Sequence, residues 1–198
     1  VRNAALGGRA FSRDPAAASR AMRAAVSGWR AGGVAATAKH FPGLGGAPAN
    51  TDRAAVTIAR SRDELDAVDL PPFSAAIGAG VPLVMVGHAR YPALDRFRIA
   101  SQSRPIIEGL LREELGFRGV VVTDALDMAA VDQSDVASAA VAAIESGVDL
   151  LLAGPAQADR PRELARLQDA LRQSPAATAA AERVAALRRW LGQGLMPP

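Results

Sequence analysis

Four short apolar segments recur along the chain, and the stretches between them carry the start and stop signals of helices. Each segment is largely continuous rather than alternating and is rich in Val or Leu, a pattern typical of strands buried on both faces of a parallel sheet. Repeated alternation of such strands with helices predicts a βα architecture built on a parallel sheet. The four segments are Gly33–Ala38, Val81–Val86, Gly119–Thr123 and Gly147–Leu152.

Capping residues and apolar spacing predict the helices between these strands. Asp14 and Pro15 supply an N-cap followed by proline at the first helical position, and Gly32 supplies a stop. The sequence Ser61–Glu64 is a capping box, in which each side chain can accept from the other's backbone N–H. Further helices are expected over residues 106–115, 134–146, 159–173 and 177–192.

Polar residues at the strand exits decide between two folds with parallel sheets. The first predicted strand runs into Lys39 and His40, the second is followed by His88, and the third by Asp124. A Rossmann-like sheet would place a G-x-G-x-x-G turn after its first strand, and the sequence has no such motif. A (β/α)8 barrel places its reactive residues at the C-terminal ends of several strands. The sequence therefore predicts an α/β fold of the (β/α)8 TIM-barrel type.

Only four βα units are recognisable, whereas a complete barrel takes about 250 residues. We therefore expect an N-terminally truncated barrel, with residues 1–198 forming the C-terminal portion of a single barrel domain. Any signal peptide or lipid anchor would then lie outside this sequence. A secreted or cell-envelope location and a cytoplasmic location both stay open.

Composition excludes several classes of partner and site. The chain has no Cys, which removes disulfides, thiolate metal ligands and cysteine nucleophiles, and its two His disfavour a zinc site built on imidazole. The arginines are scattered among acidic residues, as on solvated helix faces, rather than clustered for nucleic acid. No apolar run approaches the roughly 18 residues of a membrane span. We expect no metal, no nucleic-acid partner and no membrane span in this chain.

Two aspartates are candidates for chemistry on a sugar. Asp124 follows its strand without a break and is predicted to point into the barrel mouth; a capping or salt-bridged aspartate is the alternative. Asp52 lies in a long loop, and long loops in compact domains are often functional. Two carboxylates facing a bound sugar are what retaining glycoside hydrolysis needs. Lys39 and His40 would then hydrogen-bond sugar hydroxyls, unless they are a surface lysine and a packed histidine.

Several motifs of the chain resemble glycoside hydrolase family 3, and within it the bacterial β-N-acetylhexosaminidase branch. The two most specific are KHFPG at Lys39–Gly43 and GVVVTDALDM at Gly119–Met128, and they are specific in combination. The resemblance extends from about residue 7 to residue 155. Supporting matches are Gly8–Phe11 with Asp14-Pro15, Met85–His88, Tyr91–Asp95 and Leu111–Phe117.

The resemblance implies a retaining mechanism through a glycosyl ester on Asp124, without a metal or an organic cofactor. It implies that Arg9, Lys39 and His40 bind the substrate. We expect His88 either to contact the substrate or to hydrogen-bond a neighbouring loop. In this branch a further carboxylate that holds the sugar lies upstream of the residues present here, which leaves open whether this chain is active alone.

One departure from the branch concerns the acid/base group. The branch usually carries G-H-G after KHFP and then an Asp-Ser-His triplet, whose His is the acid/base and whose Asp orients it. This sequence has GLG at Gly43–Gly45 and NTD at Asn50–Asp52, wording that resembles an actinobacterial variant. By count, Asp52 replaces the His and Asn50 replaces the Asp. We hypothesise that Asp52 is the acid/base; since an ordinary Asp has a pKa of about 3.9, burial or a neighbouring charge must raise it.

The function expected from these residues is cleavage of terminal β-linked N-acetylglucosamine from cell-wall-type fragments. Two alternatives stay open. One is a β-glucosidase or β-xylosidase of the same family. The other is a non-catalytic glycan-binding or scaffold protein on the same fold, which the missing His of the triplet permits. In each reading the partner is a carbohydrate, and the oligomeric state is undetermined.

Overall fold

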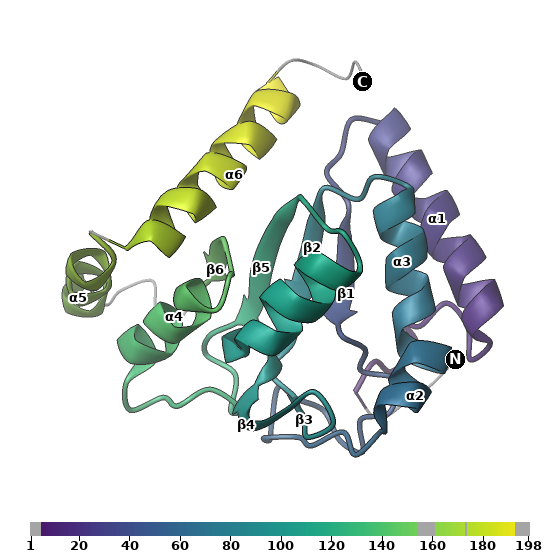
Figure 1. The fold of residues 1–198 in the computed structure, drawn as a ribbon, viewed down its shortest axis with the longest axis horizontal. Coiled ribbons are helices and arrows are strands. Elements are labelled where there is room, and N and C mark those ends of the chain that lie inside the picture. Colours follow the sequence, from purple (N-terminus) through teal and green to yellow (C-terminus); the bar gives the residue numbers. More distant parts are fainter. Residues whose placement is uncertain (1–4, 154–160, 173, 193–198) are drawn as a thin grey trace.

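All four predicted strands are present in a computed structural model of the chain, which describes residues 5–153, 161–172 and 174–192. They form one parallel sheet in the order β1-β2-β5-β6 (Figure 1). Each strand therefore pairs with the next one along the chain, apart from an inserted hairpin, as repeated βα units require. The strands are β1 (Thr37–Phe41), β2 (Leu83–Val86), β5 (Val120–Ala125) and β6 (Leu150–Leu152).

Helices connect the strands at the predicted places. The α1 and α3 helices lie side by side at the β1 end of the sheet, whereas α4, α5 and α6 lie at the β6 end (Figure 1). The elements are α1 (Pro15–Ala31), α2 (Arg62–Glu64), α3 (Leu70–Gly78), α4 (Val136–Glu145), α5 (Pro161–Leu171) and α6 (Pro175–Gly192). Short or wider-wound helices are η1 (Leu65–Asp69), η2 (Ala100–Gln102) and η3 (Pro105–Glu114).

Two helix starts confirm the capping signals in the sequence. The Asp14 side chain accepts from the Ala16 N–H at 3.0 Å, with Pro15 at the first helical position. Ser61 and Glu64 form the reciprocal capping box. Of the predicted helix over 159–173, residues 159, 160 and 173 lie outside the described residues.

The structure contains one element that the sequence analysis did not predict. An antiparallel hairpin of β3 (Arg90–Tyr91) and β4 (Asp95–Ile99) follows β2. At the start of β4, Oδ1 of Asp95 accepts from the N–H groups of Phe97 and Arg98 in the same strand at 2.9 and 3.2 Å. The hairpin was not predicted because β3 has only two residues, too few to show an alternating apolar pattern. Hydrogen bonds to a side chain such as Asp95 also leave no mark in that pattern.

The two faces of the sheet differ in what covers them. Ala38, Val84 and Val121 are in register across three strands and belong to the main apolar core with the helices. The opposite face carries the exposed Lys39 of β1, and in β6 both Leu150 and Leu152 are 40% exposed. Burial on both faces, expected from the continuous apolar runs, is therefore wrong for β1 and β6, because the described helices pack on one face.

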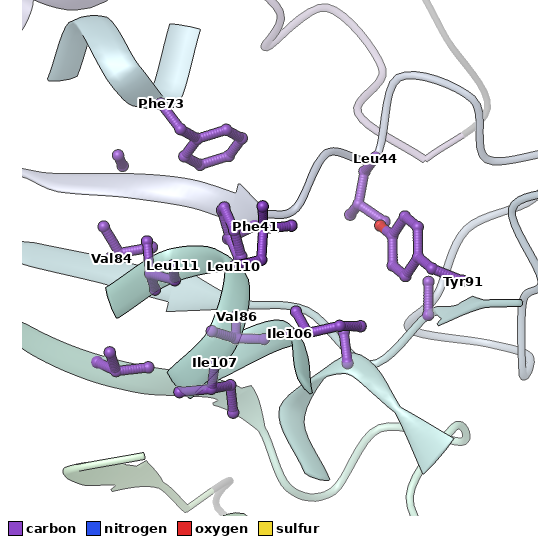
Figure 2. Packing of buried hydrophobic residues seen from close by; sticks show 14 of the residues in the cluster. Phe41, Leu44, Phe73, Val84, Val86, Tyr91, Ile106, Ile107, Leu110 and Leu111 are labelled. Carbon is purple, nitrogen blue, oxygen red and sulfur yellow. The ribbon is translucent and has the colours of Figure 1, made fainter. Parts of the chain in front are cut away.

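Aromatic and branched side chains fix the C-terminal ends of β1 and β2. Phe41 and Phe73 pack edge to face, with ring centroids 5.1 Å apart and an interplanar angle of 89°. Figure 2 shows η3 residues, among them Ile106 and Ile107, close to Val86 in this packing. The end of β1, which carries His40, and the end of β2, which His88 follows, are therefore tightly packed against the core.

A buried carboxylate just before β6 joins three elements. The Asp149 side chain has no exposed surface, and it accepts from Arg112 of η3 at 2.8 Å and from Arg183 of α6 at 2.7 Å. It also accepts from the backbone N–H of Val121 at 2.8 Å. Asp149 thus ties η3 and α6 to the middle of β5.

Candidate functional site

A break in strand register shapes the end of β1. Lys39 pairs with Met85 and Phe41 pairs with Val86, so His40 is an extra residue in the ladder between β1 and β2. Such bulges redirect side chains and are common beside active sites. Lys39 is exposed on the face opposite the helices, whereas His40 is only 7% exposed. Both residues lie within β1 rather than after it, since the strand begins later than the sequence indicated.

Asp124 lies beside His40, at the exit of the strand two places along the sheet. It follows Thr123, which pairs with Val86 at the end of β2. One carboxylate oxygen, Oδ1, accepts from the Ala125 N–H at 2.9 Å. The other, Oδ2, lies 3.5 Å from Nε2 of His40, and the Asp124 side chain is 15% exposed. The strand exits therefore bring these two predicted site residues together.

The charges around His40 show that the predicted residues form one cluster. Burial lowers the pKa of His40 from its ordinary 6.5 to about 4. The negative charges of Asp124 and Asp52 raise this pKa, whereas the positive charges of Lys39 and Arg9 lower it. His40 is therefore neutral at physiological pH, and its buried Nδ1 has no hydrogen-bond partner among the described residues.

A cavity of about 480 Å³ opens beside this cluster. Arg9, Lys39 and His40 line it, with Arg13, Arg60 and Asp69 from elsewhere in the chain. Arg9 is held by the carbonyls of Leu6 and Ala5, to which its guanidinium donates at 3.1 and 3.3 Å. The three residues expected to bind the substrate thus share one hollow, and His40 among them lies 3.5 Å from Asp124, which does not itself line this cavity.

Asp52 lies on the loop between β1 and α2, where Asn50 contacts it twice. The Asn50 amide donates to Oδ2 of Asp52 at 3.1 Å, and the Asp52 backbone N–H donates to Oδ1 of Asn50 at 2.9 Å. Asp52 is exposed. The first of the two conditions expected for an acid role, burial, is therefore not met by Asp52, which leaves a neighbouring charge as the other.

Contacts that the sequence analysis missed fix both ends of this loop. The Tyr91 hydroxyl donates to the carbonyl of Gly43 at 2.9 Å, and the Ile58 N–H donates to the carbonyl of Arg90 at 2.9 Å. Arg60 forms an ion pair with Asp69, and burial raises the pKa of Asp69 to about 6 against the opposing effect of Arg60. The sequence held one signal that could have singled out Asp69, namely its position directly before Leu-Pro-Pro at the start of a helix.

Gly43 cannot be replaced freely at the start of the loop. Its φ is +138°, a conformation that side chains rarely adopt. A Cβ at this position would also lie 2.5 Å from the Cβ of Asp69. The glycine after His-Phe-Pro is therefore required by the close approach of the loop to Asp69.

His88 follows β2 and contacts the residue after Asp124. It is 1% exposed, with Nδ1 2.7 Å from the Ser101 hydroxyl and Nε2 3.1 Å from the carbonyl of Ala125. Both ring nitrogens are thus engaged within the protein, as in the second of the two expectations for this residue. The contact with Ser101 had no signal in the sequence.

A sequence model described as the glycosyl hydrolase family 3 N-terminal domain matches residues 1–187. The chain belongs to glycoside hydrolase family 3. This confirms the family suggested by KHFPG and by the strand that ends in Asp124.

Relatives within the family are named as hexosaminidases. A β-hexosaminidase of Stenotrophomonas maltophilia (strain R551-3) is 43% identical over 76% of this chain and 45% of its own length. The family 3 β-N-acetylglucosaminidase of Paenibacillus sp. str. FPU-7 superposes with a TM-score of 0.87 at 33% identity, covering 99% of this chain and 38% of its own. The β-N-acetylhexosaminidase of Beutenbergia cavernae DSM 12333 superposes with a TM-score of 0.84 at 35% identity, covering 91% of this chain and 55% of its own.

These comparisons confirm the barrel type predicted from the strand exits. The family 3 chain spans about half the length of the curated relatives it matches. The four-stranded parallel sheet with its helices corresponds to part of the N-terminal domain of the family.

Two kinds of feature are absent from the described part of the family 3 chain. Among residues 5–153, 161–172 and 174–192, no group of three or more His, Asp or Glu side chains is placed to hold a metal ion. In the same residues, no helix is both long and apolar enough to cross a membrane.

We expect His40 to make folding of the family 3 chain sensitive to acid. The unfolded chain protonates this histidine below about pH 6.5, whereas the folded protein protonates it only near pH 4. The unfolded state binds more protons between these values, so this group lowers the free energy of unfolding as the pH falls from about 6.5 to 4. Urea unfolding across this range should show a flatter dependence in His40→Gln than in the unchanged protein.

Asp69 serves as a control, because its effect on the pH dependence of stability has the opposite sign to that of His40. Its pKa is raised from 3.8 to about 6, so the folded state binds more protons between these values and gains stability as the pH falls. Asp69→Asn should therefore steepen the loss of stability in acid. Equal slopes in His40→Gln and in the unchanged protein would contradict the assignment to His40.

Proposed function

We propose that the protein carrying this chain is a retaining glycosidase that removes terminal β-linked N-acetylglucosamine from cell-wall-type fragments. The observation that supports this most is the 3.5 Å approach between Nε2 of His40, which lines the cavity, and the carboxylate of Asp124. The sugar class follows from relatives that are named β-hexosaminidases and β-N-acetylglucosaminidases. The cavity chemistry fits a hydroxyl-rich ligand, because it combines cationic donors with a free ring nitrogen.

In the first step, Asp124 acts as the nucleophile. A carboxylate oxygen of Asp124 attacks the anomeric carbon, and the bond from that carbon to the leaving oxygen breaks. The leaving oxygen takes a proton from the carboxylic acid of Asp52. The products are a glycosyl ester on Asp124, a free hydroxyl on the leaving group, and the Asp52 carboxylate.

In the second step, water releases the sugar. The Asp52 carboxylate takes a proton from a water molecule as the water oxygen attacks the anomeric carbon. The ester bond to Asp124 breaks, which restores both side chains to their starting states. Asn50 supports both steps by holding the Asp52 carboxylate through its amide.

Arg9, Lys39 and His40 bind the sugar in this proposal. All three line the cavity, and the Nδ1 of His40 is buried without a partner among the described residues. A buried polar atom without a hydrogen bond is costly, so a movement of the His40 ring that lets a sugar hydroxyl pair with Nδ1 would gain affinity.

The test of this function is covalent trapping on the protein that carries the chain. An activated fluoro-sugar of the N-acetylglucosamine series should leave a mass adduct on the peptide that contains Asp124. The matched glucose and xylose reagents separate the hexosaminidase from a β-glucosidase or a β-xylosidase. Binding of the sugar without any adduct would support a non-catalytic glycan-binding protein instead.

Asp52 is expected to matter most for substrates with poor leaving groups. In Asp52→Ala, hydrolysis of an unactivated β-N-acetylglucosaminide should fall by about 100-fold or more, because no group protonates the leaving oxygen. Formation of the ester from an activated aryl substrate should change far less. Both rates are measured by sugar release and by burst kinetics. Full activity of Asp52→Ala on the unactivated substrate would exclude the role.

A further inference from the structure

His88 is held in one orientation by two partners from different parts of the chain. Its Nδ1 lies 2.7 Å from the hydroxyl of Ser101 in η2, and its Nε2 lies 3.1 Å from the carbonyl of Ala125. His88 and Ser101 are each 1% exposed. The ring therefore bridges η2 to the residue that follows Asp124.

The chemistry of the two partners determines where the ring carries its proton. A carbonyl oxygen only accepts, so Nε2 must carry the hydrogen and donate to Ala125. Burial lowers the pKa of His88, which keeps the ring neutral with a single N–H. Nδ1 therefore has a free lone pair and accepts from the Ser101 hydroxyl. All hydrogen-bonding groups of the ring are satisfied in this tautomer.

The Ala125 residue connects this arrangement to the carboxylate of Asp124 through two peptide groups, one on each side of its Cα. The N–H of the first donates to Oδ1 of Asp124 at 2.9 Å, and the carbonyl of the second accepts from His88. The contact to Oδ1 leaves Oδ2 on the side of His40, at 3.5 Å from Nε2. Rotation of the Ala125 residue would move its N–H away from Oδ1 and free the carboxylate to turn.

We propose that His88 is a positioning residue for Asp124, which acts through the Ala125 backbone by donating from Nε2 while Ser101 fixes the tautomer. This rests on the proposed function of Asp124 as the nucleophile. His88 does not contact the sugar. Its effect is to hold the carboxylate in one rotamer, so that the attacking oxygen is in place before the substrate arrives.

The test uses two amide substitutions in the protein that carries this chain. In His88→Gln the side-chain amide N–H can reach the Ala125 carbonyl, whereas in His88→Asn the shorter amide can reach only Ser101. Ser101→Ala removes the group that fixes the tautomer. Ser146→Ala is the matched control, since Ser146 is also buried and donates to the backbone of η2 at Gln102 but does not contact His88.

We expect kcat to fall in the variants that lose the hydrogen bond to the Ala125 carbonyl and to be retained in those that keep it. In His88→Asn we expect kcat to fall by about 10–100-fold with little change in KM, because misplacement of a reacting group reduces the rate without removing sugar contacts. His88→Gln should recover most of kcat. Ser101→Ala should lie between them, and Ser146→Ala should leave both constants unchanged.

Several outcomes would overturn the proposal. Equal losses in His88→Asn and His88→Gln, or losses only in melting temperature with kcat unchanged, would indicate a purely structural histidine. A ¹⁵N spectrum that places the imidazole proton on Nδ1 would also reject it. If the unchanged protein turns over no substrate, the proposed function itself fails; if it does and His88→Asn retains its kcat, only the positioning role fails.

Discussion

Replacement of Asp124 by alanine should lower hydrolysis of β-N-acetylglucosaminides on the order of 10⁴-fold, a loss typical of removing a catalytic nucleophile. Without the carboxylate no glycosyl ester can form, although Arg9, Lys39 and His40 still line the cavity. KM should therefore change much less than kcat. The measurement is steady-state release of an aryl leaving group, compared at saturating substrate.

A small external nucleophile distinguishes the loss of a nucleophile from general damage. Azide can occupy the space of the missing Asp124 carboxylate and attack the anomeric carbon as the aryl group leaves. The product should be a glycosyl azide of inverted configuration, and its formation should restore turnover in Asp124→Ala. Asp127→Ala, three residues along in the turn after β5, is the control and should retain nearly full activity. Retained ester formation in Asp124→Ala would refute the assignment.

The second large effect concerns stability rather than chemistry. Asp149→Ala should lower the free energy of unfolding by about 3–5 kcal/mol, the usual cost of removing one partner of a buried ion pair. Arg112 is 6% exposed and would keep its charge without this carboxylate, and Arg183 and the Val121 N–H would lose the same acceptor. Urea unfolding followed by far-UV circular dichroism measures the loss.

An exposed pair in the same chain gives the matched control. Asp169 and Arg172 lie 3.0 Å apart, with side chains 74% and 73% exposed. Exposed pairs contribute little to stability, so Asp169→Ala should leave the unfolding curve nearly unchanged. A similarly small effect for Asp149→Ala would show that the contacts of Asp149 with Arg112 and Arg183 are not required for stability.

The parallel sheet and its helices were predictable because their signals are local. Continuous Val and Leu runs marked the strands, and residues such as Asp14 and Ser61 marked helix starts through contacts within a few positions. The strand exits also located Lys39, His40 and Asp124, since neighbouring parallel strands end at one edge of a sheet.

The remaining parts of the site depend on contacts between distant residues, which no local pattern encodes. Tyr91 reaches the carbonyl of Gly43, and Arg60 reaches Asp69, through the tertiary fold alone. The exposure of Asp52 likewise follows from the path of its loop, which the residues beside it in the sequence do not determine. Lys39 could be placed at the site from its KHFPG motif, whereas no motif indicated that Ser101 contacts His88.

The hydrogen bond between Tyr91 and Gly43 has a consequence for the order of folding. The two residues are 48 positions apart, so during synthesis the loop that carries Asp52 leaves the ribosome well before the residue that anchors its start. Asp124 follows later still. The loop therefore cannot reach its final path until the hairpin of β3 and β4 has been made. A chain stalled before Tyr91 would contain Lys39 and His40 in β1 and Asp52 in the following loop, and yet lack the contact that anchors the start of that loop.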